Sequence, residues 1–181
     1  MPYLLLINGN PGMGKSTLAQ RYVDEHPMAL NADVDLMWHM IGQWQSSRPE
    51  SDRLKFKYAQ ELAGLHLADG YDVIVPSLIE SAEICAAFEQ IAQTHRAVFK
   101  EFALLSTPDD AIERCKSRAR SMGFADGFRP GGVLDTTGRE AKLQAMYGNV
   151  MQVIATRPNT ICIESVNGQA DAAYAALLRA I

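Results

Sequence analysis

The sequence predicts a three-layer α/β fold, in which a five-stranded parallel sheet lies between two layers of helices. Short apolar runs that stop at Gly, Pro or Asp are typical of strands buried on both faces. They alternate with segments of helical periodicity along the whole chain. A strand–helix–strand crossover favours parallel pairing, with helices on both faces of the sheet. The length of 181 residues suits one domain spanning residues 1–181, without a linker or internal repeat.

Five segments have the pattern of strands. The first is apolar and ends at Gly9, and the third is a β-branched run that stops at Pro76. The predicted strands are 3–8, 28–32, 73–75, 98–105 and 160–163.

Helical segments follow each of these strands. Thr107-Pro108-Asp109-Asp110 is a strong start signal, because it combines a capping hydroxyl, proline at the first helical position and acids near the positive end of the helix dipole. Gly70 is placed to end an earlier helix. The predicted helices are 16–25, 35–44, 52–69, 84–92, 108–120, 138–156 and 169–180.

Composition excludes several classes of protein. The net charge is −4 and no basic block occurs, so nucleic acid is unlikely as the main partner. The apolar run 4–7 is too short for a signal peptide or a membrane span, so we expect no membrane partner. Cys85, Cys115 and Cys162 lack metal-ligand spacing, and they indicate buried thiols in a reducing compartment, by default the cytoplasm.

Residues 9–16 match the phosphate-binding pattern G-x-x-x-x-G-K-[ST] at every fixed position. Glycines let main-chain N–H groups approach phosphate oxygens, and the following helix adds its positive end. Lys15 would reach the β- and γ-phosphates, and the Ser16 hydroxyl would ligate Mg²⁺. The alternative is a glycine-rich turn that matches by chance. The predicted nucleoside triphosphate contacts are Gly9, Asn10, Pro11, Gly12, Met13, Gly14, Lys15, Ser16 and Thr17.

Asp33 and Asp35 follow the second predicted strand, at the edge where parallel sheets bind ligands. Phosphoryl transfer to a hydroxyl needs a carboxylate that orients or deprotonates the acceptor, which is the role predicted for Asp35. Asp33 is predicted to act on the metal side. The alternative is that one of the two only caps the next helix.

Together, the loop 9–16, the Asp33-x-Asp35 pair, the five strands and a later arginine-rich segment resemble the small P-loop kinases. This group includes shikimate and gluconate kinases, nucleotide kinases, chloramphenicol phosphotransferase and the zeta-toxin kinases. The resemblance implies the P-loop fold with strand order 2-3-1-4-5, ATP with Mg²⁺ as donor and a hydroxyl acceptor. Many relatives carry an acid after the third strand, where this chain has Pro76-Ser77. Asp33 or Glu80 would substitute for that acid.

An arginine-rich segment follows the fourth strand and is predicted to form a lid at about residues 114–137. Arg118 and Arg120 would neutralise charge on the transferred phosphoryl group. Arg114 and Arg129 are further candidates for the same role. Residues 118–124 resemble the lid edge of gluconate kinases. The alternative is a solvated basic helix face.

Two further segments are candidates for ligand contact. The apolar helix after Asp35 belongs either to the core or to the wall of an acceptor pocket. Asn167-Gly168, after the fifth strand, corresponds to the loop that passes the adenine base in relatives, or is a plain turn. The residues weighed for the acceptor side are Met37, Trp38, Met40, Ile41, Trp44, Arg53, Tyr58 and Glu61; His39 and His66 are expected to be solvated or satisfied locally.

We therefore predict an ATP-dependent phosphotransferase that acts on a hydroxyl of a small molecule, such as a metabolite, nucleoside, sugar or antibiotic. Two alternatives stay open. One is a toxin-like or polynucleotide 5′-hydroxyl kinase, although the acidic net charge weighs against polynucleotides. The other is a nucleotide-dependent switch without an acceptor.

Overall fold

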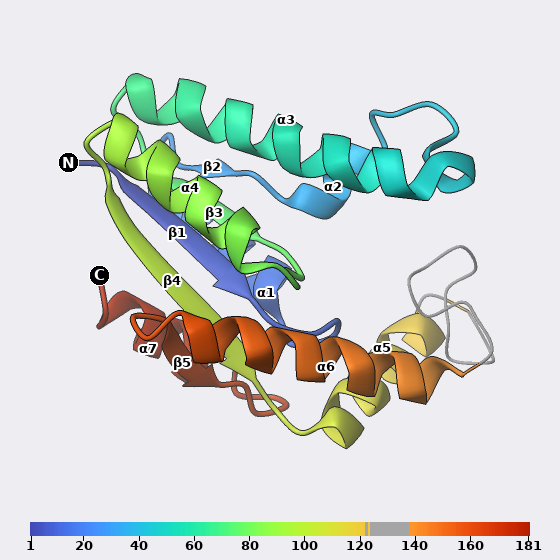
Figure 1. The fold of residues 1–181 in the computed structure, drawn as a ribbon. Helices are drawn as coiled ribbons and strands as arrows, with labels where there is room; N and C mark the ends of the chain where they lie inside the picture. The colour runs from blue at the N-terminus through green and yellow to red at the C-terminus, as the bar shows by residue number, and fades with distance from the viewer. Residues whose placement is uncertain (122, 124–137) are drawn as a thin grey trace.

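A computed structural model of the chain describes residues 1–121, 123 and 138–181 (Figure 1). Strands and helices alternate along it as the sequence predicts. The strands are β1 Tyr3–Asn8, β2 Leu30–Asn31, β3 Val73–Pro76, β4 Val98–Leu105 and β5 Ile161–Glu164. The helices are α1 Lys15–Glu25, α2 Val34–Trp38, the 3₁₀ helix η1 Trp44–Ser47, α3 Arg48–Ala68, α4 Ala82–Thr94, α5 Pro108–Ser121, α6 Arg139–Thr156 and α7 Ala170–Leu178.

The five strands form one parallel sheet in the order β2-β3-β1-β4-β5, which confirms the predicted fold class and strand order. The central strand β1 pairs with β3 on one side and with β4 on the other. All strands therefore end at the same edge of the sheet. The loops that leave this edge bring together segments that are far apart in the sequence.

Alternate residues of β1 supply two separate cores. Leu4 and Leu6 pack with side chains of α2, α3, α4 and α6 on one face. Leu5 and Ile7 pack with side chains of α1, α5 and α7 on the other face. Consecutive apolar residues at positions 4–7 are needed because both faces of the strand are buried. Figure 1 shows α3, α4 and α6 on the near side of the sheet and α1 behind it.

The largest difference from the predicted elements lies after β2. The predicted helix 35–44 is only the short α2, and the chain then turns through Gln43, which has a φ of 51°, into η1. The turn lets Trp44 fold back onto Trp38, with the rings stacked at 4.9 Å between centroids. Packing of the two indoles thus takes the place of the helix predicted to continue to residue 44. The next helix, α3, begins at Arg48 instead of residue 52.

The helix starts and ends read from the sequence agree better elsewhere. The Thr107 hydroxyl accepts a hydrogen bond from the main-chain N–H of Asp110, as expected for the cap of α5. Gly70 ends α3 with a φ of 88°. Of the predicted lid, residues 114–121 belong to α5, whereas residues 122 and 124–137, including Arg129, lie outside the described residues. Across the part of the chain that is described, we find no helix with the length and apolar character to span a lipid bilayer.

Candidate active site

The loop between β1 and α1 owes its shape to three glycines. Gly9, Gly12 and Gly14 have φ values of 142°, 83° and 83°, which residues with a Cβ atom rarely adopt. Gly9 also lies against main chain: a Cβ added there would be 2.6 Å from the carbonyl oxygen of Leu104. The sequence 9–16 therefore forms a curled loop at the start of a helix, as a phosphate-binding loop requires.

Buried side chains fix this loop from inside the protein. The Asn8 carboxamide oxygen accepts hydrogen bonds from the N–H groups of Gly9 (2.7 Å) and Ile79 (2.9 Å). Asn10 donates to the carbonyl of Leu143 in α6 at 3.2 Å. Met13 is buried in the core beside α1. The loop is thus anchored to β1, to the segment after β3, and to α6.

Lys15 folds back onto the loop. Its ammonium group donates to the carbonyls of Gly9 at 2.7 Å and Asn10 at 3.0 Å. Burial lowers the pKa of Lys15 to about 8, an effect opposed by the negative charges of Asp35 and Asp33. Phosphate oxygens would offer this desolvated ammonium a stronger, charged partner than the two carbonyls.

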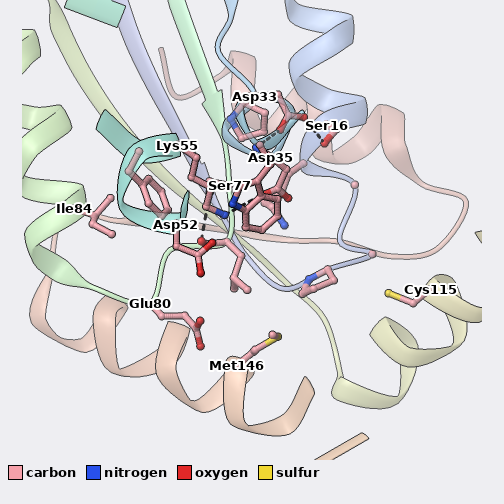
Figure 2. Close-up of a pocket in the computed structure, with 18 of the residues that line it drawn as sticks. Ser16, Asp33, Asp35, Asp52, Lys55, Ser77, Glu80, Ile84, Cys115 and Met146 are labelled. Atoms are coloured by element: carbon pink, nitrogen blue, oxygen red, sulfur yellow. Dashed lines mark hydrogen bonds and ion pairs between the residues drawn. The ribbon is translucent and has the colours of Figure 1, made fainter. Parts of the chain in front are cut away.

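A cavity of about 800 Å³ opens beside the loop. Its wall combines the loop with the segments after β2 and β3 and with α3, α5 and α6. Figure 2 shows Ser16, Asp33, Asp35 and Lys55 grouped on one side, with Glu80 and Met146 opposite them and Cys115 entering from α5. The predicted loop residues that line this cavity are Pro11, Gly12, Gly14, Lys15 and Ser16.

Ser16 and Asp33 lie together in this wall. The Ser16 hydroxyl donates to Asp33 Oδ2 at 3.0 Å, while Asp33 Oδ1 caps α2 by accepting from the N–H of Asp35 at 3.0 Å. Asp33 thus has the capping position weighed as its alternative role and still faces the Ser16 hydroxyl. Partial burial raises the pKa of Asp33. A hydroxyl beside a carboxylate is an oxygen donor set that suits Mg²⁺, so these two residues fit the predicted ion.

Glu80, the other acid considered for the metal, lines the same cavity but is turned toward α6. Its Oε1 accepts a hydrogen bond from Asn149 Nδ2 at 2.8 Å. Pro76 and Ser77 form the wall at the end of β3 and supply no carboxylate there. Asp33 is therefore the better placed of the two substitutes, since it already contacts Ser16.

Asp35 faces the cavity from the first turn of α2, with 57% of its side chain exposed. Its Oδ1 accepts a hydrogen bond from Lys55 Nζ at 3.1 Å, and Lys55 itself is only 8% exposed. Burial lowers the pKa of Lys55, against the opposing charge of Asp35. The carboxylate predicted to meet the acceptor is thus paired with a buried cation that the sequence reading did not single out.

The apolar helix after Asp35 divides between the two roles weighed for it. Met37 belongs to the core, whereas Trp38 lines the cavity. Met40 is 69% exposed and contributes to neither. Arg48 completes this wall, with its guanidinium carbon 4.4 Å from the centre of the Trp38 ring and 4.8 Å from that of Trp44. The cavity lining does not include Ile41, Arg53, Tyr58, Glu61, His39 or His66.

A second cavity of about 630 Å³ lies on the other side of the loop, between α5 and the segment after β5. Met13, Thr17 and Asn167 line it, as expected for nucleotide contacts, together with Gly12 and Gly14, which line both cavities. Since the loop separates the two cavities, the pair can accommodate the two ends of one extended ligand. Gly9 and Asn10 line neither and take part only through the shape of the loop.

The three described arginines of α5 differ in their surroundings. Arg118 lines both cavities. Arg120 lines only the second and pairs with Glu113 at 2.6 Å. Arg114 donates to the Ser165 hydroxyl at 2.8 Å and to the Ser165 carbonyl, so it ties α5 to the end of β5. Arg118 is the arginine with the position best suited to a ligand that spans both cavities.

A family model described as an AAA domain matches residues 4–143, more than three quarters of the chain. The chain belongs to this family. The matched span includes the phosphate loop, Asp33, Asp35 and the three arginines of α5. No curated protein matches the sequence.

Solved structures are similar to this AAA domain over nearly its whole length. A gluconokinase from Sinorhizobium meliloti 1021 is 16% identical with a TM-score of 0.60, over 99% of this chain and 93% of that one. A candidate kinase from Chloroflexus aurantiacus j-10-fl is 13% identical with a TM-score of 0.65, over 99% and 98%. A chain of the Pnkp1/Rnl/Hen1 RNA repair complex is 16% identical with a TM-score of 0.62, over 86% of this chain and 46% of that one. These similarities establish the P-loop kinase fold.

The sequence reading of this AAA domain missed Lys55, Asp52 and Lys142 in the larger cavity. A signal for Lys55 exists. The buried face of α3 consists of residues spaced by four, and a lysine occupies one of these positions. A charged residue on the buried stripe of an amphipathic helix calls for a partner. The partner, Asp35, lies 20 positions earlier in the chain, which the helical pattern could not reveal.

Proposed function

We propose that this AAA domain transfers the γ-phosphoryl group of ATP to a hydroxyl group of a small molecule. The observation that carries the proposal is that Asp35, with an exposed carboxylate, faces the same cavity as Lys15 and Ser16 of the phosphate loop. A site that only binds nucleotide does not need a second carboxylate there, whereas phosphoryl transfer needs a group that orients or deprotonates the attacking oxygen. An acceptor hydroxyl placed between Asp35 and the loop would meet the γ-phosphate directly.

The proposed step is an in-line displacement. The acceptor oxygen forms a bond to the γ-phosphorus while the bond from that phosphorus to the β,γ-bridging oxygen breaks, and ADP leaves. The acceptor proton passes to Asp35 and then to solvent. Lys15 and Arg118 neutralise negative charge on the phosphoryl oxygens during transfer. Arg120 lines the second cavity together with Arg118, and it has the same proposed role of neutralising charge on the phosphoryl oxygens.

Ser16 and Asp33 are the residues that would hold Mg²⁺, directly or through water. When bound, the ion neutralises charge on the β- and γ-phosphates. Thr17 and Asn167 lie in the second cavity, where they would contact the nucleoside end of ATP. Each part of the donor thus has proposed contacts on one side of the loop or the other.

A small acceptor is favoured over a polymer because the larger cavity has a volume of about 800 Å³ and must also hold the γ-phosphate. Its wall carries both acids and bases, including Asp52, Glu80, Arg48 and Lys142, so a polar acceptor suits it. The net charge of −4 gives no general attraction for a polynucleotide backbone. Because the chain of the RNA repair complex has the same fold, the test must also include a 5′-hydroxyl oligonucleotide as a candidate acceptor.

The test is a transfer screen with γ-labelled ATP, and in parallel GTP, over metabolites, nucleosides, sugars, hydroxylated antibiotics and a 5′-hydroxyl oligonucleotide. For the acceptor that is labelled, Asp35→Asn should lower the rate by about 10²- to 10⁴-fold, the usual contribution of a positioned base. Nucleotide affinity, measured by calorimetry, should stay unchanged. Glu61→Gln, an exposed acid of α3 outside the cavity lining, is the matched control and should behave as wild type.

Two outcomes would contradict the proposal. Normal turnover of Asp35→Asn would remove Asp35 from the reaction. Steady hydrolysis of ATP with no labelled acceptor would favour a nucleotide-dependent switch.

A further inference from the structure

Lys55 lies in a position where an isolated ammonium group would be costly. It is on the buried face of α3, and its Nζ is 3.4 Å from the centre of the Trp38 ring and 5.1 Å from that of Phe56. Apart from these two rings, Lys55 Nζ contacts Asp35 Oδ1 at 3.1 Å, its hydrogen-bond partner among the described residues. The cation is therefore held between aromatic faces and directed at one carboxylate oxygen.

Asp35 is restrained at two points that leave one oxygen available. Its main-chain N–H is bound by Asp33 Oδ1 at 3.0 Å, which fixes the backbone. Its Oδ1 is bound by Lys55, whereas its Oδ2 has no hydrogen-bond partner among the described residues. Since the side chain is more than half exposed to the cavity, Oδ2 is the atom free to accept a hydrogen bond from a ligand.

Without Lys55, another cation competes for this carboxylate. The negative charge of Asp35 raises the pKa of Lys15 more than that of Asp33 does, so Asp35 attracts the Lys15 ammonium. A freed Asp35 side chain would be drawn toward the Lys15 ammonium and away from the acceptor. Lys55 binds Asp35 Oδ1 at 3.1 Å and so opposes that movement.

The aromatic support of Lys55 is itself rigid. Trp38 is stacked on Trp44 with an interplanar angle of 9°, and Arg48 lies over both indoles. Cation–π contacts of this kind favour one placement of each charged group. The direction from which Lys55 reaches Asp35 is thus set by packing.

We infer that Lys55 is a positioning residue, which holds Oδ1 of Asp35 so that Oδ2 faces the acceptor hydroxyl. The inference rests on the proposed function, because it assigns Lys55 a part in the same reaction. It distinguishes Lys55 from a residue that binds the nucleotide or only stabilises the fold.

The kinetic test compares Lys55→Met, which removes the charge and keeps a long side chain, with Lys55→Arg and with the control Lys57→Met. Lys57 is exposed on the same helix, two positions away. With the acceptor from the screen, Lys55→Met should lower kcat by about 10- to 100-fold through misplacement of the carboxylate, with KM for ATP unchanged. Lys55→Arg should recover part of the rate. In the Asp35→Asn background, Lys55→Met should cause no further loss.

A second arm needs no acceptor and separates this inference from the proposed function. The chain has two tryptophans, Trp38 and Trp44, so intrinsic fluorescence reports on the support of Lys55. Lys55→Met should change the emission, Asp35→Asn should change it in the same direction, and the double variant should match Lys55→Met alone. Lys57→Met should leave it unaltered.

The inference is overturned if the fluorescence effects of the two substitutions add independently, or if Asp35→Asn leaves the emission unchanged. It is also overturned if Lys55→Met keeps the full transfer rate, or raises KM for ATP while kcat stays the same. A screen that finds no acceptor would defeat the proposed function, and the fluorescence arm would still decide whether Lys55 restrains Asp35.

Discussion

Alanine in place of either Gly9 or Gly14 should separate the stability of the phosphate loop from its ability to bind. Both glycines have positive φ, but their surroundings differ. A Cβ at Gly9 would meet the Leu104 carbonyl oxygen at 2.6 Å, whereas a Cβ at Gly14 has no heavy atom within 4 Å. Gly14 lines both cavities, so its added methyl group would project where the phosphates are expected.

The size of the effect follows from these contacts. Positive φ costs an alanine about 1–3 kcal/mol at either site. Forcing a carbon against the Leu104 carbonyl adds about 1–3 kcal/mol for Gly9→Ala. For a chain of this size, about 2–4 °C of Tm is lost per kcal/mol. Gly9→Ala should therefore melt about 2–12 °C below Gly14→Ala, the range given by the clash alone.

Two measurements check this contrast. Thermal unfolding followed by circular dichroism gives the two Tm values, and calorimetry with ATP and Mg²⁺ gives the affinities. Gly14→Ala should lose the larger share of nucleotide affinity while it remains the more stable variant. If Gly9→Ala were as stable as Gly14→Ala, the close approach of residue 9 to the Leu104 carbonyl would not require glycine at that position.

Two further predictions concern α5. Burial raises the pKa of Cys115, so this thiol should react slowly with thiol reagents. Because Cys115 lies beside the phosphate loop, bound ATP should slow its reaction further. Cys162 is exposed and should react at the same rate with and without ATP, as measured by peptide mass mapping. Equal labelling of Cys115 with and without ATP would contradict the nucleotide site. Arg118→Ala should lower kcat by about 10²-fold. Arg120→Ala should lower it less, because Arg120 is paired with Glu113, and equal rates for both variants and wild type would remove the arginines from catalysis.

The fold could be predicted from the sequence because each strand and its crossover helix carry local signals. Buried strands such as β1 are apolar over a continuous run, here residues 4–7, and Thr107 caps α5 through its own side chain. The segment after Asp35 could not be predicted in the same way. Its shape depends on Trp38 and Trp44 meeting across a turn, and a helical pattern of apolar residues contains no record of that contact.

The donor half of the site could be predicted better than the acceptor half. The phosphate loop is contiguous, so its residues appear together in the sequence, and Asp33 and Asp35 follow a strand directly. The acceptor side of the cavity includes residues of α3 and α6, among them Lys55, Asp52 and Lys142. Only the folded chain brings these residues to Asp35. The predicted roles of Arg118, Arg120 and Asn167, and the cytoplasmic location, remain predictions.

The bonds that Lys15 makes to the carbonyls of Gly9 and Asn10 have a kinetic consequence. An incoming triphosphate has to displace these two carbonyls from the ammonium group. The net free energy of its contact with Lys15 is smaller for that reason. After the proposed transfer, the same carbonyls would again accept hydrogen bonds from Lys15 and so compete with ADP. An internal competitor of this kind weakens the binding of ATP and of ADP alike, because each must displace the same two carbonyls, and so it favours release of the product.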